Sequence, residues 1–397
     1  MRSLILFAVV IVAVSPVYPQ SNLSSVAEVF SDIGVQVFGL VTKSKPQENV
    51  VLSPYGISSI LGMLMLGADG LTKKQLATAM RYNINARSSK VLKKLQKALL
   101  TRKNKDIITI ANAVFAQAGF KMEKSFVTDN KALFHCDVKS LDFSDTADAA
   151  AKVNQWVQNQ TRGMIKDLIQ PHVLDNVFTR LVVVNSIYFK GLWKSHFQAE
   201  NTKVRGFTGP DKVTYQVPMM TQLNMFNYGS ASTPSGLLYN ILELPYHGQM
   251  VSMLIVLPVD SSTPLSAIIP HISTKTVQSW MSSLSQRRVQ IMIPKFTAES
   301  ELSLEEPLSA LGITDMFQES KANFAKITMS EQLYVSYALQ KAKIEVNEDG
   351  TKASAATTAV LMARSSPPWF IVDRPFLFCI RHNPTGSILF MGQITKP

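Results

Sequence analysis

The feature that most constrains this 397-residue chain is a run of small residues between two strand-like segments. From Thr351 to Ala359 the run holds only Thr, Ala, Ser and one Lys. It has too little apolar bulk to nucleate a core and no helical period, so by itself it is typical of an exposed segment. Strand alternation places small uncharged residues, among them Thr351, Ala353 and Ala355, on one face and Lys352 on the other. The run can therefore be an outer loop or a buried central strand.

The residues on either side of this run suit it to a change of position. Gly350 can absorb a large change in φ and ψ, as a hinge must. Beyond the run, Arg364-Ser365 is a bond that a trypsin-like protease with an acidic primary pocket cleaves when the bond is exposed. Pro367 and Pro368 then stiffen the chain. A disordered linker with a chance Arg-Ser pair is the alternative, and the strand-rich tail that follows disfavours it.

Three motifs around the run resemble those of the serpins, the serine protease inhibitor superfamily. Glu348-Asp-Gly-Thr351 resembles the serpin hinge, and Asp373-Arg-Pro-Phe-Leu-Phe378 resembles the strand after the reactive-centre loop. Arg-His-Asn-Pro-Thr-Gly-Ser-Ile-Leu-Phe-Met-Gly at 381–392 resembles the C-terminal signature. Further matches at 49–64, 66–70 and 189–194 extend the resemblance over residues 24–397. The family places its cleaved residue fourteen positions after the hinge Gly, which here is Arg364.

The resemblance implies an α+β serpin fold, in which helices flank a large central mixed β-sheet and a reactive-centre loop is exposed over 348–370. It assigns the reactive bond to Arg364 and Ser365, and the hinge to Glu348, Gly350, Thr351, Ala353 and Ala355. Trp193 would lie at the breach, where the loop enters the sheet, and Ser53, Asn185 and Gln340 would form the shutter beneath it. Many serpins have His where this chain has Gln340.

The activity that the resemblance implies is suicide-substrate inhibition of trypsin-like serine proteases, such as thrombin, urokinase, tissue plasminogen activator, plasmin and trypsin. The protease would form a covalent complex with a monomeric inhibitor. Two alternatives stay open: a plasminogen-activator-inhibitor-like serpin, and a non-inhibitory serpin. The chain is not expected to be an enzyme, because its six His have no metal-ligand spacing and no Gly-x-Ser-x-Gly elbow is present. No cofactor or metal is expected.

Residues 71–105 hold eleven basic residues and no acidic one, in a chain whose net charge is +12. Lys90, Lys93, Lys94 and Lys97 recur at helical spacing and share one face, and Arg102, Lys103 and Lys105 extend it. Like charges at this spacing repel by roughly 0.2–0.5 kcal/mol per pair, which favours a bound anion. In the resemblance, the region 81–105 binds heparin or heparan sulfate. A solvated helix face is the alternative, and nucleic acid is disfavoured because no nucleic-acid-binding motif accompanies the charge.

Residues 1–20 combine Arg2 with an apolar run from Leu4 to Val14, the pattern of a secretory signal peptide too short to span a bilayer. No later stretch is expected to span a membrane. We therefore expect a secreted, extracellular protein, a single domain over 21–397, held at cell surfaces or matrix by glycosaminoglycans. Asn22 and Asn159 lie in glycosylation sequons. Cys136 and Cys379 are expected to be separate buried thiols.

Periodicity also predicts individual elements. Apolar residues at helical spacing predict helices over 26–40, 57–66, 90–99 and 146–161. Continuous or alternating apolar runs predict strands over 107–115, 181–189, 213–228, 239–245, 249–257, 288–296, 333–346, 371–381 and 387–394.

Overall fold

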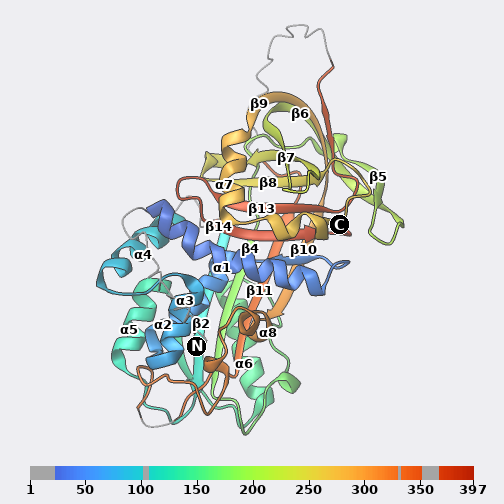
Figure 1. Ribbon diagram of the computed structural model, residues 1–397. Coiled ribbons are helices and arrows are strands. Elements are labelled where there is room, and N and C mark those ends of the chain that lie inside the picture. The colour runs from blue at the N-terminus through green and yellow to red at the C-terminus, as the bar shows by residue number, and fades with distance from the viewer. Residues whose placement is uncertain (1–22, 102–106, 330–331, 351–365) are drawn as a thin grey trace, which may run out of the picture.

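The structure, a computed structural model, describes residues 23–101, 107–329, 332–350 and 366–397. The helices are α1 (Leu23–Ser44), α2 (Pro54–Gly67), α3 (Gly70–Met80), α4 (Ala86–Leu99), α5 (Lys124–Phe134), α6 (Thr146–Gln160), α7 (Thr274–Ser283) and α8 (Glu305–Ala310). They surround two β-sheets (Figure 1).

The five-stranded sheet has the order β10 (Phe296–Ser303), β11 (Tyr337–Val346), β4 (Leu181–Phe189), β2 (Ile108–Gln117), β3 (Asp137–Leu141). It is mixed, because β11 runs parallel to β4 and β2 runs parallel to β3, while the pairs β10–β11 and β2–β4 are antiparallel. Every residue of β4 is buried, as its continuous apolar sequence predicts for a strand covered on both faces. β4 and β11 thus form the middle of the molecule.

Helices cover this sheet on both sides. Val183 and Ile187 of β4 join the main core together with α2, while Val182 and Val184 join a second core cluster with α6. Successive residues of a strand point to opposite faces, so α2 and α6 lie on opposite sides of the sheet. Leu339 of β11 belongs to this cluster as well, together with Ile165, Leu168 and Ile169 of the connection that follows α6, so the layer on the α6 side extends to β11.

The second sheet stands at the opposite pole of the molecule from α6 (Figure 1). Its order is β1 (Val50–Leu52), β14 (Ile388–Ile394), β13 (Phe376–His382), β8 (Val251–Pro258), β7 (Leu238–Pro245), β6 (Thr214–Ser232), β9 (Ser285–Pro294), β12 (Trp369–Ile371), and β5 (Lys203–Thr208) also pairs with β6. β12 is therefore the edge strand next to β9. Mixed sheets with flanking helices confirm the predicted α+β class.

Several predicted elements differ from the structure in their limits. The strand predicted over 371–381 is interrupted around Pro375, a residue without an N–H to donate to a ladder, and its two parts pair with different strands. The strand predicted from residue 333 begins at Tyr337. Helices α3, α5 and α7 were not predicted, since only a few residues of each are buried and their apolar periodicity is weak.

The expectation that no stretch after residue 20 is apolar enough to span a membrane is wrong by length and composition. α1 is long and apolar enough to meet that criterion, but 61% of its most apolar 18-residue stretch is buried inside the protein. The two cysteines are free and buried, as predicted. Burial raises the pKa of the Cys379 thiol to about 12, so this side chain stays a neutral thiol at neutral pH. The signal peptide predicted over 1–20 lies outside the described residues.

Candidate functional site

The predicted reactive bond lies outside the described residues, together with part of the predicted hinge. These are Thr351, Ala353, Ala355, Arg364 and Ser365. The structure does place both ends of the segment to which they belong. β11 leads to Gly350 at one end, and residues 366–368 lead into β12 at the other.

The strand that leads to Gly350 pairs directly with β4. Tyr337 to Ile344 align in parallel with Val182 to Phe189, and no other strand lies between them. We call this junction the seam. A segment that continues from β11 can enter the sheet as a neighbouring strand only by separating the two sides of the seam. The polar contacts across the seam are therefore the contacts that govern such an entry.

The shutter residues meet at the middle of the seam. Gln340 Nε2 donates to Asn185 Oδ1 at 2.9 Å, which joins the two strands through their side chains. The same amide accepts from Ser53 N at 2.8 Å and donates to the Ser53 carbonyl at 3.1 Å. All three residues are fully buried. The structure thus brings together Ser53, Asn185 and Gln340, the three residues that the resemblance assigned to the shutter.

This network continues to residues that the sequence analysis missed. Asn185 Nδ2 donates to Asn112 Oδ1 at 2.8 Å, and Asn112 Nδ2 donates to the Phe134 carbonyl at 2.9 Å. A buried polar group is costly without a partner, so an Asn inside the apolar strand 107–115 was the signal that could have identified it. Gly56 is part of the same site, because a Cβ there would lie 2.1 Å from Asn185 Oδ1.

Trp193, which the resemblance assigned to the breach, lies where the seam ends. Its Nε1 donates to the Asn347 carbonyl at 2.8 Å, and its backbone N donates to the Asp349 carbonyl at 3.0 Å. Its ring stacks on Tyr246, with centroids 4.3 Å apart and planes 14° apart. One side chain therefore ties the continuation of β11 to the second sheet.

Glu348 fastens the hinge from the other side. Its carboxylate pairs with Lys295 Nζ at 2.8 Å and accepts from Thr202 Oγ1 at 2.9 Å. Partial burial raises the pKa of this carboxyl, but the bonds to Lys295, to the backbone and to Thr202 outweigh burial and lower it overall. The Glu348 carbonyl also accepts from Phe197 N at 3.1 Å.

Gly350 is held close to the neighbouring backbone. A Cβ on Gly350 would lie 2.4 Å from His196 Cβ and 2.8 Å from His196 N. Its φ is not among the positive values of the chain. In this structure, close approach is therefore what requires glycine at the hinge.

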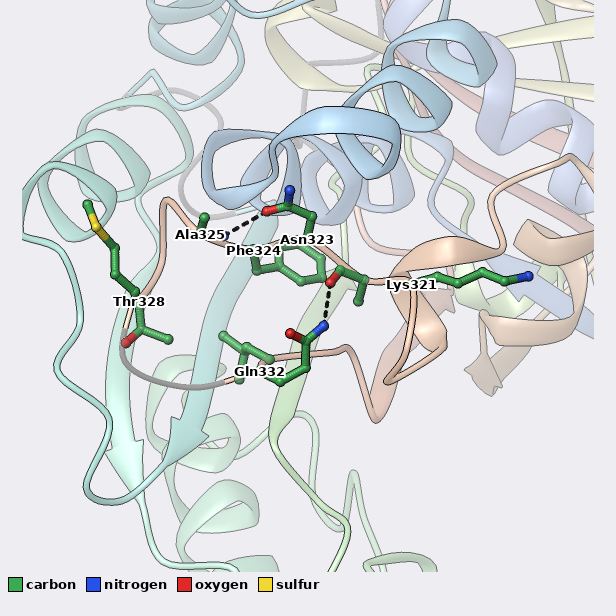
Figure 2. A pocket seen from close by; sticks show the side chains of 9 residues that line it. Lys321, Asn323, Phe324, Ala325, Thr328 and Gln332 are labelled. Carbon is green, nitrogen blue, oxygen red and sulfur yellow. Dashed lines mark hydrogen bonds between the residues drawn. The ribbon is translucent and has the colours of Figure 1, made fainter.

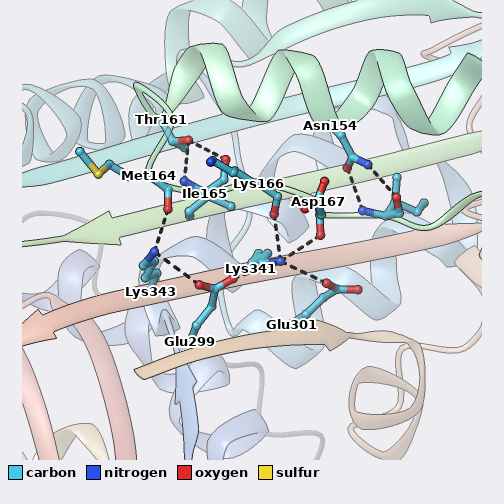
Figure 3. A network of polar contacts seen from close by, with 11 residues as sticks. Asn154, Thr161, Met164, Ile165, Lys166, Asp167, Glu299, Glu301, Lys341 and Lys343 are labelled. Carbon is cyan, nitrogen blue, oxygen red and sulfur yellow. Dashed lines mark hydrogen bonds and ion pairs between the residues drawn. The ribbon is translucent and has the colours of Figure 1, made fainter. Parts of the chain in front are cut away.

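A second polar cluster holds the seam from the α6 side, and the sequence analysis did not predict it (Figure 3). Lys341 Nζ donates to the carbonyls of Lys166 and Asp167 at 3.0 and 2.9 Å, and it pairs with Glu299 at 3.1 Å and Glu301 at 3.5 Å. The Lys341 side chain is only 9% exposed. A buried ammonium needs such a set of acceptors, because its desolvation is otherwise unfavourable.

The carbonyls of this cluster belong to the connection between α6 and β4. Lys343 Nζ reaches the Met164 carbonyl of the same connection at 3.1 Å. Asn154 of α6 fixes the connection through two bonds with the backbone of Ile169, at 2.8 and 2.9 Å. We call this set of contacts the clamp; it is formed by Lys341, Lys343, Glu299, Glu301 and residues 164–167. Because it joins β11 to the connection that leads into β4, a strand that enters between β11 and β4 has to pass beneath it.

The basic helix predicted around Lys90 is α4. Asn85 caps it by accepting from Arg87 N and Ser88 N, and Leu92, Leu95 and Leu99 bury its apolar face. Its outer face carries four exposed lysines: Lys90, Lys93, Lys94 and Lys97. None of the ion pairs found among residues 23–101, 107–329, 332–350 and 366–397 involves these four. Arg102, Lys103 and Lys105 lie outside the described residues.

Of the two predicted glycosylation sites, the structure describes Asn159, which is exposed at the end of α6, and Asn22 lies outside the described residues. Within the described part of the chain, no cluster of three or more metal-ligating side chains is found.

A pocket of about 610 Å³ is lined by residues between Lys321 and Leu333 (Figure 2). Its polar side chains bond their own loop: Gln332 Nε2 donates to the Ala322 carbonyl at 2.9 Å, and Asn323 Oδ1 accepts from Ala325 N at 3.2 Å. The pocket borders residues 330–331, which the structure does not describe. It therefore provides no candidate site.

Comparisons with known proteins agree with this geometry. The family described as "Serpin (serine protease inhibitor)" matches residues 28–397. Glia-derived nexin of Rattus norvegicus is 62% identical over 391 residues, 98% of each chain, and plasminogen activator inhibitor 1 of Bos taurus is 44% identical over 96% of this chain and 94% of the relative. A crystal structure of native protease nexin-1 with heparin is 60% identical with a TM-score of 0.92, covering 95% of this chain and all of that one.

Proposed function

Because the chain belongs to the serpin family of serine protease inhibitors, we propose that it traps a trypsin-like protease covalently at Arg364-Ser365. The sequence Ala-Arg-Ser-Ser-Pro-Pro-Trp at 363–369 indicates a resemblance to glia-derived nexin, and that resemblance is confirmed by the 62% identity. The finer steps of the mechanism are our proposal.

In this mechanism, Arg364 occupies the acidic primary pocket of the protease. The protease Ser Oγ attacks the Arg364 carbonyl, the bond to Ser365 breaks, and the Ser365 nitrogen leaves as an amine. The Arg364 acyl group is then joined to the protease as an ester. The freed segment inserts into the seam from Thr351 onward, carrying the protease away, and hydrolysis of the ester stalls.

One observation carries this proposal most directly. The small-residue run begins at residue 351, five residues after β11 ends at Val346, and β11 and β4 are direct neighbours. An inserted strand would replace the ladder of hydrogen bonds between β11 and β4 with two ladders, one to each of these strands. Its small side chains would lie between the layers of α2 and α6. The uninserted form is then metastable, held by a kinetic barrier.

The exposed lysines of α4 support heparin or heparan sulfate as an activating polyanion. Protease nexin-1, a 60% identical structure, was crystallised with heparin. A polyanion that binds Lys90, Lys93, Lys94 and Lys97, together with Arg102, Lys103 and Lys105, can also bind a basic patch on the protease. It would raise the rate of encounter, and salt would weaken the effect.

The remaining assignments are part of the same proposal. The leader over 1–20 directs secretion, glycosaminoglycans retain the protein at cell surfaces or matrix, and the inhibitor is a monomer without an enzymatic activity of its own. The sequons at Asn22 and Asn159 would carry glycans. Inhibition of plasminogen activators is the second candidate activity, which the 44% identity to plasminogen activator inhibitor 1 favours.

The test is to mix the secreted protein with thrombin, with and without heparin, and to run a denaturing gel. We expect a band at the summed mass that forms faster with heparin and is absent with Arg364→Glu. Clean cleavage after Arg364 without that band would make the loop an ordinary substrate and would favour a non-inhibitory serpin. A complex whose rate ignores heparin, or is unchanged when the α4 lysines become Gln, would refute the polyanion role alone.

A further inference from the structure

A small pocket lies at the end of the seam that is far from the hinge. It has a volume of about 190 Å³, and it is built by the segment before β4, the start of α8 and the segment that leads into β11. Its lining combines four aromatic residues with two acidic ones: Phe178, Phe317, Tyr334, Tyr337, Asp175 and Glu305. We call it the base pocket.

The base pocket adjoins the last contact of the seam. Ser336 N donates to the Leu181 carbonyl at 2.9 Å, and Arg180 N donates to Ser336 Oγ at 2.8 Å. These bonds join the two sides of the seam just before β11 and β4 begin. Ser336 and Thr179, on either side of this junction, both line the pocket. A strand that filled the seam along its whole length would therefore end at the base pocket.

The two carboxylates of the pocket have no cationic partner among the residues that the structure describes, since none of the ion pairs there involves Asp175 or Glu305. The adjacent Arg180 donates instead to the carbonyls of Val177 and Thr179. Burial chiefly raises the pKa of the Tyr337 hydroxyl, and the charges of Asp175 and Glu305 raise it further. Both carboxylates therefore act on the same part of the pocket.

This lining suits a guanidinium group. The face of an aromatic ring attracts a cation, and a carboxylate pairs with it. A guanidinium can do both at once, because it is planar, stacks on aromatic rings and donates from several N–H groups in a fixed geometry. The chemistry of the pocket thus favours an Arg side chain as its occupant.

The length of the small-residue segment brings one Arg of this chain to the pocket. Asp349-Gly350 is a dipeptide that favours a two-residue hairpin loop. With that loop, Thr351 would lie opposite Glu348. Each further residue of an inserted strand would then match one residue back along β11, so Arg364 would lie opposite Val335. Val335 lines the base pocket.

The same register gives Arg364 the side of the sheet on which the pocket is lined by Tyr337. Ala338 of β11 faces the main core, whereas Tyr337 packs against the cluster on the α6 side. In this register, the small uncharged residues of the segment would face the main core, and Lys352 and Arg364 would face the α6 side. A shift by one residue would turn Lys352 into the main core, which its charge disfavours.

We propose that the base pocket receives the guanidinium of Arg364 once the cleaved loop has inserted into the seam. The inference rests on the proposed function and names the residues that hold the cleaved end. The guanidinium leaves the acidic pocket of the protease and gains two carboxylates and aromatic walls in its place. Arg364 held there cannot occupy the protease pocket that positions its ester for attack by water, so hydrolysis of the ester is slow.

The first measurement is the half-life of the covalent complex with a trypsin-like protease, followed as the return of protease activity. We expect Asp175→Asn and Glu305→Gln each to shorten it roughly three- to tenfold, because each removes one charge from the pocket and keeps the shape of the side chain. The rate of complex formation and the unfolding midpoint of the uncleaved protein should not change, since the pocket acts after cleavage. Glu306→Gln is the matched control, because this exposed neighbour in α8 does not line the pocket.

The second measurement distinguishes Arg364 from a cation of the protease. In the cleaved chain after release of the protease, Arg364 is a new C-terminal residue. A carboxypeptidase specific for C-terminal Arg and Lys can remove it only while its side chain is out of the pocket. We expect mass spectrometry to show faster removal from Asp175→Asn and Glu305→Gln, by the same factor as the half-life, and wild-type removal from Glu306→Gln.

The outcomes separate this inference from the proposed function. If the wild-type chain is cleaved after Arg364 without forming a covalent complex, the proposed function fails, and the carboxypeptidase assay on that cleaved chain still decides the pocket. If the complex forms and neither rate depends on the two carboxylates, only the pocket assignment is refuted. A shorter half-life with unchanged removal of Arg364 would mean that the pocket holds a group of the protease, which would also overturn the proposal.

Discussion

Replacing Gln340 with Met tests whether the shutter holds the seam closed. Met retains the length of the side chain but none of its hydrogen bonds. The Ser53 carbonyl keeps a bond from Ile57 N, so two buried groups lose the partners seen in the structure: Ser53 N–H and Asn185 Oδ1. An orphaned buried group costs about 1–3 kcal/mol, so Gln340→Met should destabilise the fold by about 2–6 kcal/mol.

The same change should hasten the spontaneous conversion of the inhibitor into an inactive form, because that conversion requires the seam to open. Opening the seam breaks the Gln340–Asn185 bond in the wild-type protein, and the variant has no such bond to break. If half of a 2 kcal/mol destabilisation lowers the opening barrier, the rate rises by about fivefold. The assay is the half-life of protease-inhibiting activity during incubation at 37 °C.

Gln393→Met is the matched control for this experiment. Gln393 of β14 is also a buried Gln, and its Nε2 donates to the carbonyls of Lys45 and Glu48, at 2.8 and 2.9 Å, away from the seam. Both variants should have lower unfolding midpoints, but only Gln340→Met should shorten the half-life of activity. Equal half-lives in the two variants would refute a specific role of Gln340 in holding the seam.

Three further predictions concern other contacts of the site and the core. Trp193→Phe keeps an aromatic ring against Tyr246 but leaves the Asn347 carbonyl without the indole donor. It should destabilise the fold by about 1 kcal/mol, measured by calorimetry, and shorten the half-life of activity, measured as residual protease inhibition. Lys341→Met removes the ammonium from the clamp, so we expect faster loop insertion, measured as a higher ratio of inhibition to substrate turnover. An unchanged ratio would mean that the clamp only fastens the connection to α6. His382 is buried, and desolvation, followed by the nearby Arg381, lowers its pKa in the folded protein to about 4. Because the unfolded state binds the proton more tightly, the stability of the wild-type protein should fall as pH drops from 6.5 toward 4. The urea midpoint of His382→Gln should depend less on pH over that range than the wild-type midpoint does.

The sequence predicted the polar residues of the shutter and breach because they lie in motifs, but it did not reveal the contacts that join them. Asn112 lies within a predicted strand, and only the register of β2 against β4 places it beside Asn185. Lys341 was read as part of a strand. Its acceptors are backbone carbonyls and carboxylates distant in sequence, which no local pattern indicates.

The exposure of Leu223 and Met225 on β6 was missed for a different reason. Thr221, Leu223 and Met225 alternate with polar neighbours, and alternation of this kind ordinarily predicts that the apolar side faces the core. In the structure, Val289 and Ile291 of the adjoining strand face the core, while Leu223 and Met225 are exposed. Alternation reports that two sides differ, and tertiary packing decides which side is covered.

The contacts across the seam share a physical character that fits the proposed movement. At its middle the strands are joined by Gln340, at its end by Trp193, and over its face by the Lys341 clamp, all through directional polar bonds. Directional bonds are lost over a small displacement, whereas burial of apolar area declines gradually with separation. A seam held in this way stays closed until the bonds at one end break, and it then opens toward the other end. A segment that continues from β11 meets the bonds of Glu348 and Trp193 first, so these bonds are the ones whose loss would begin the opening that we propose.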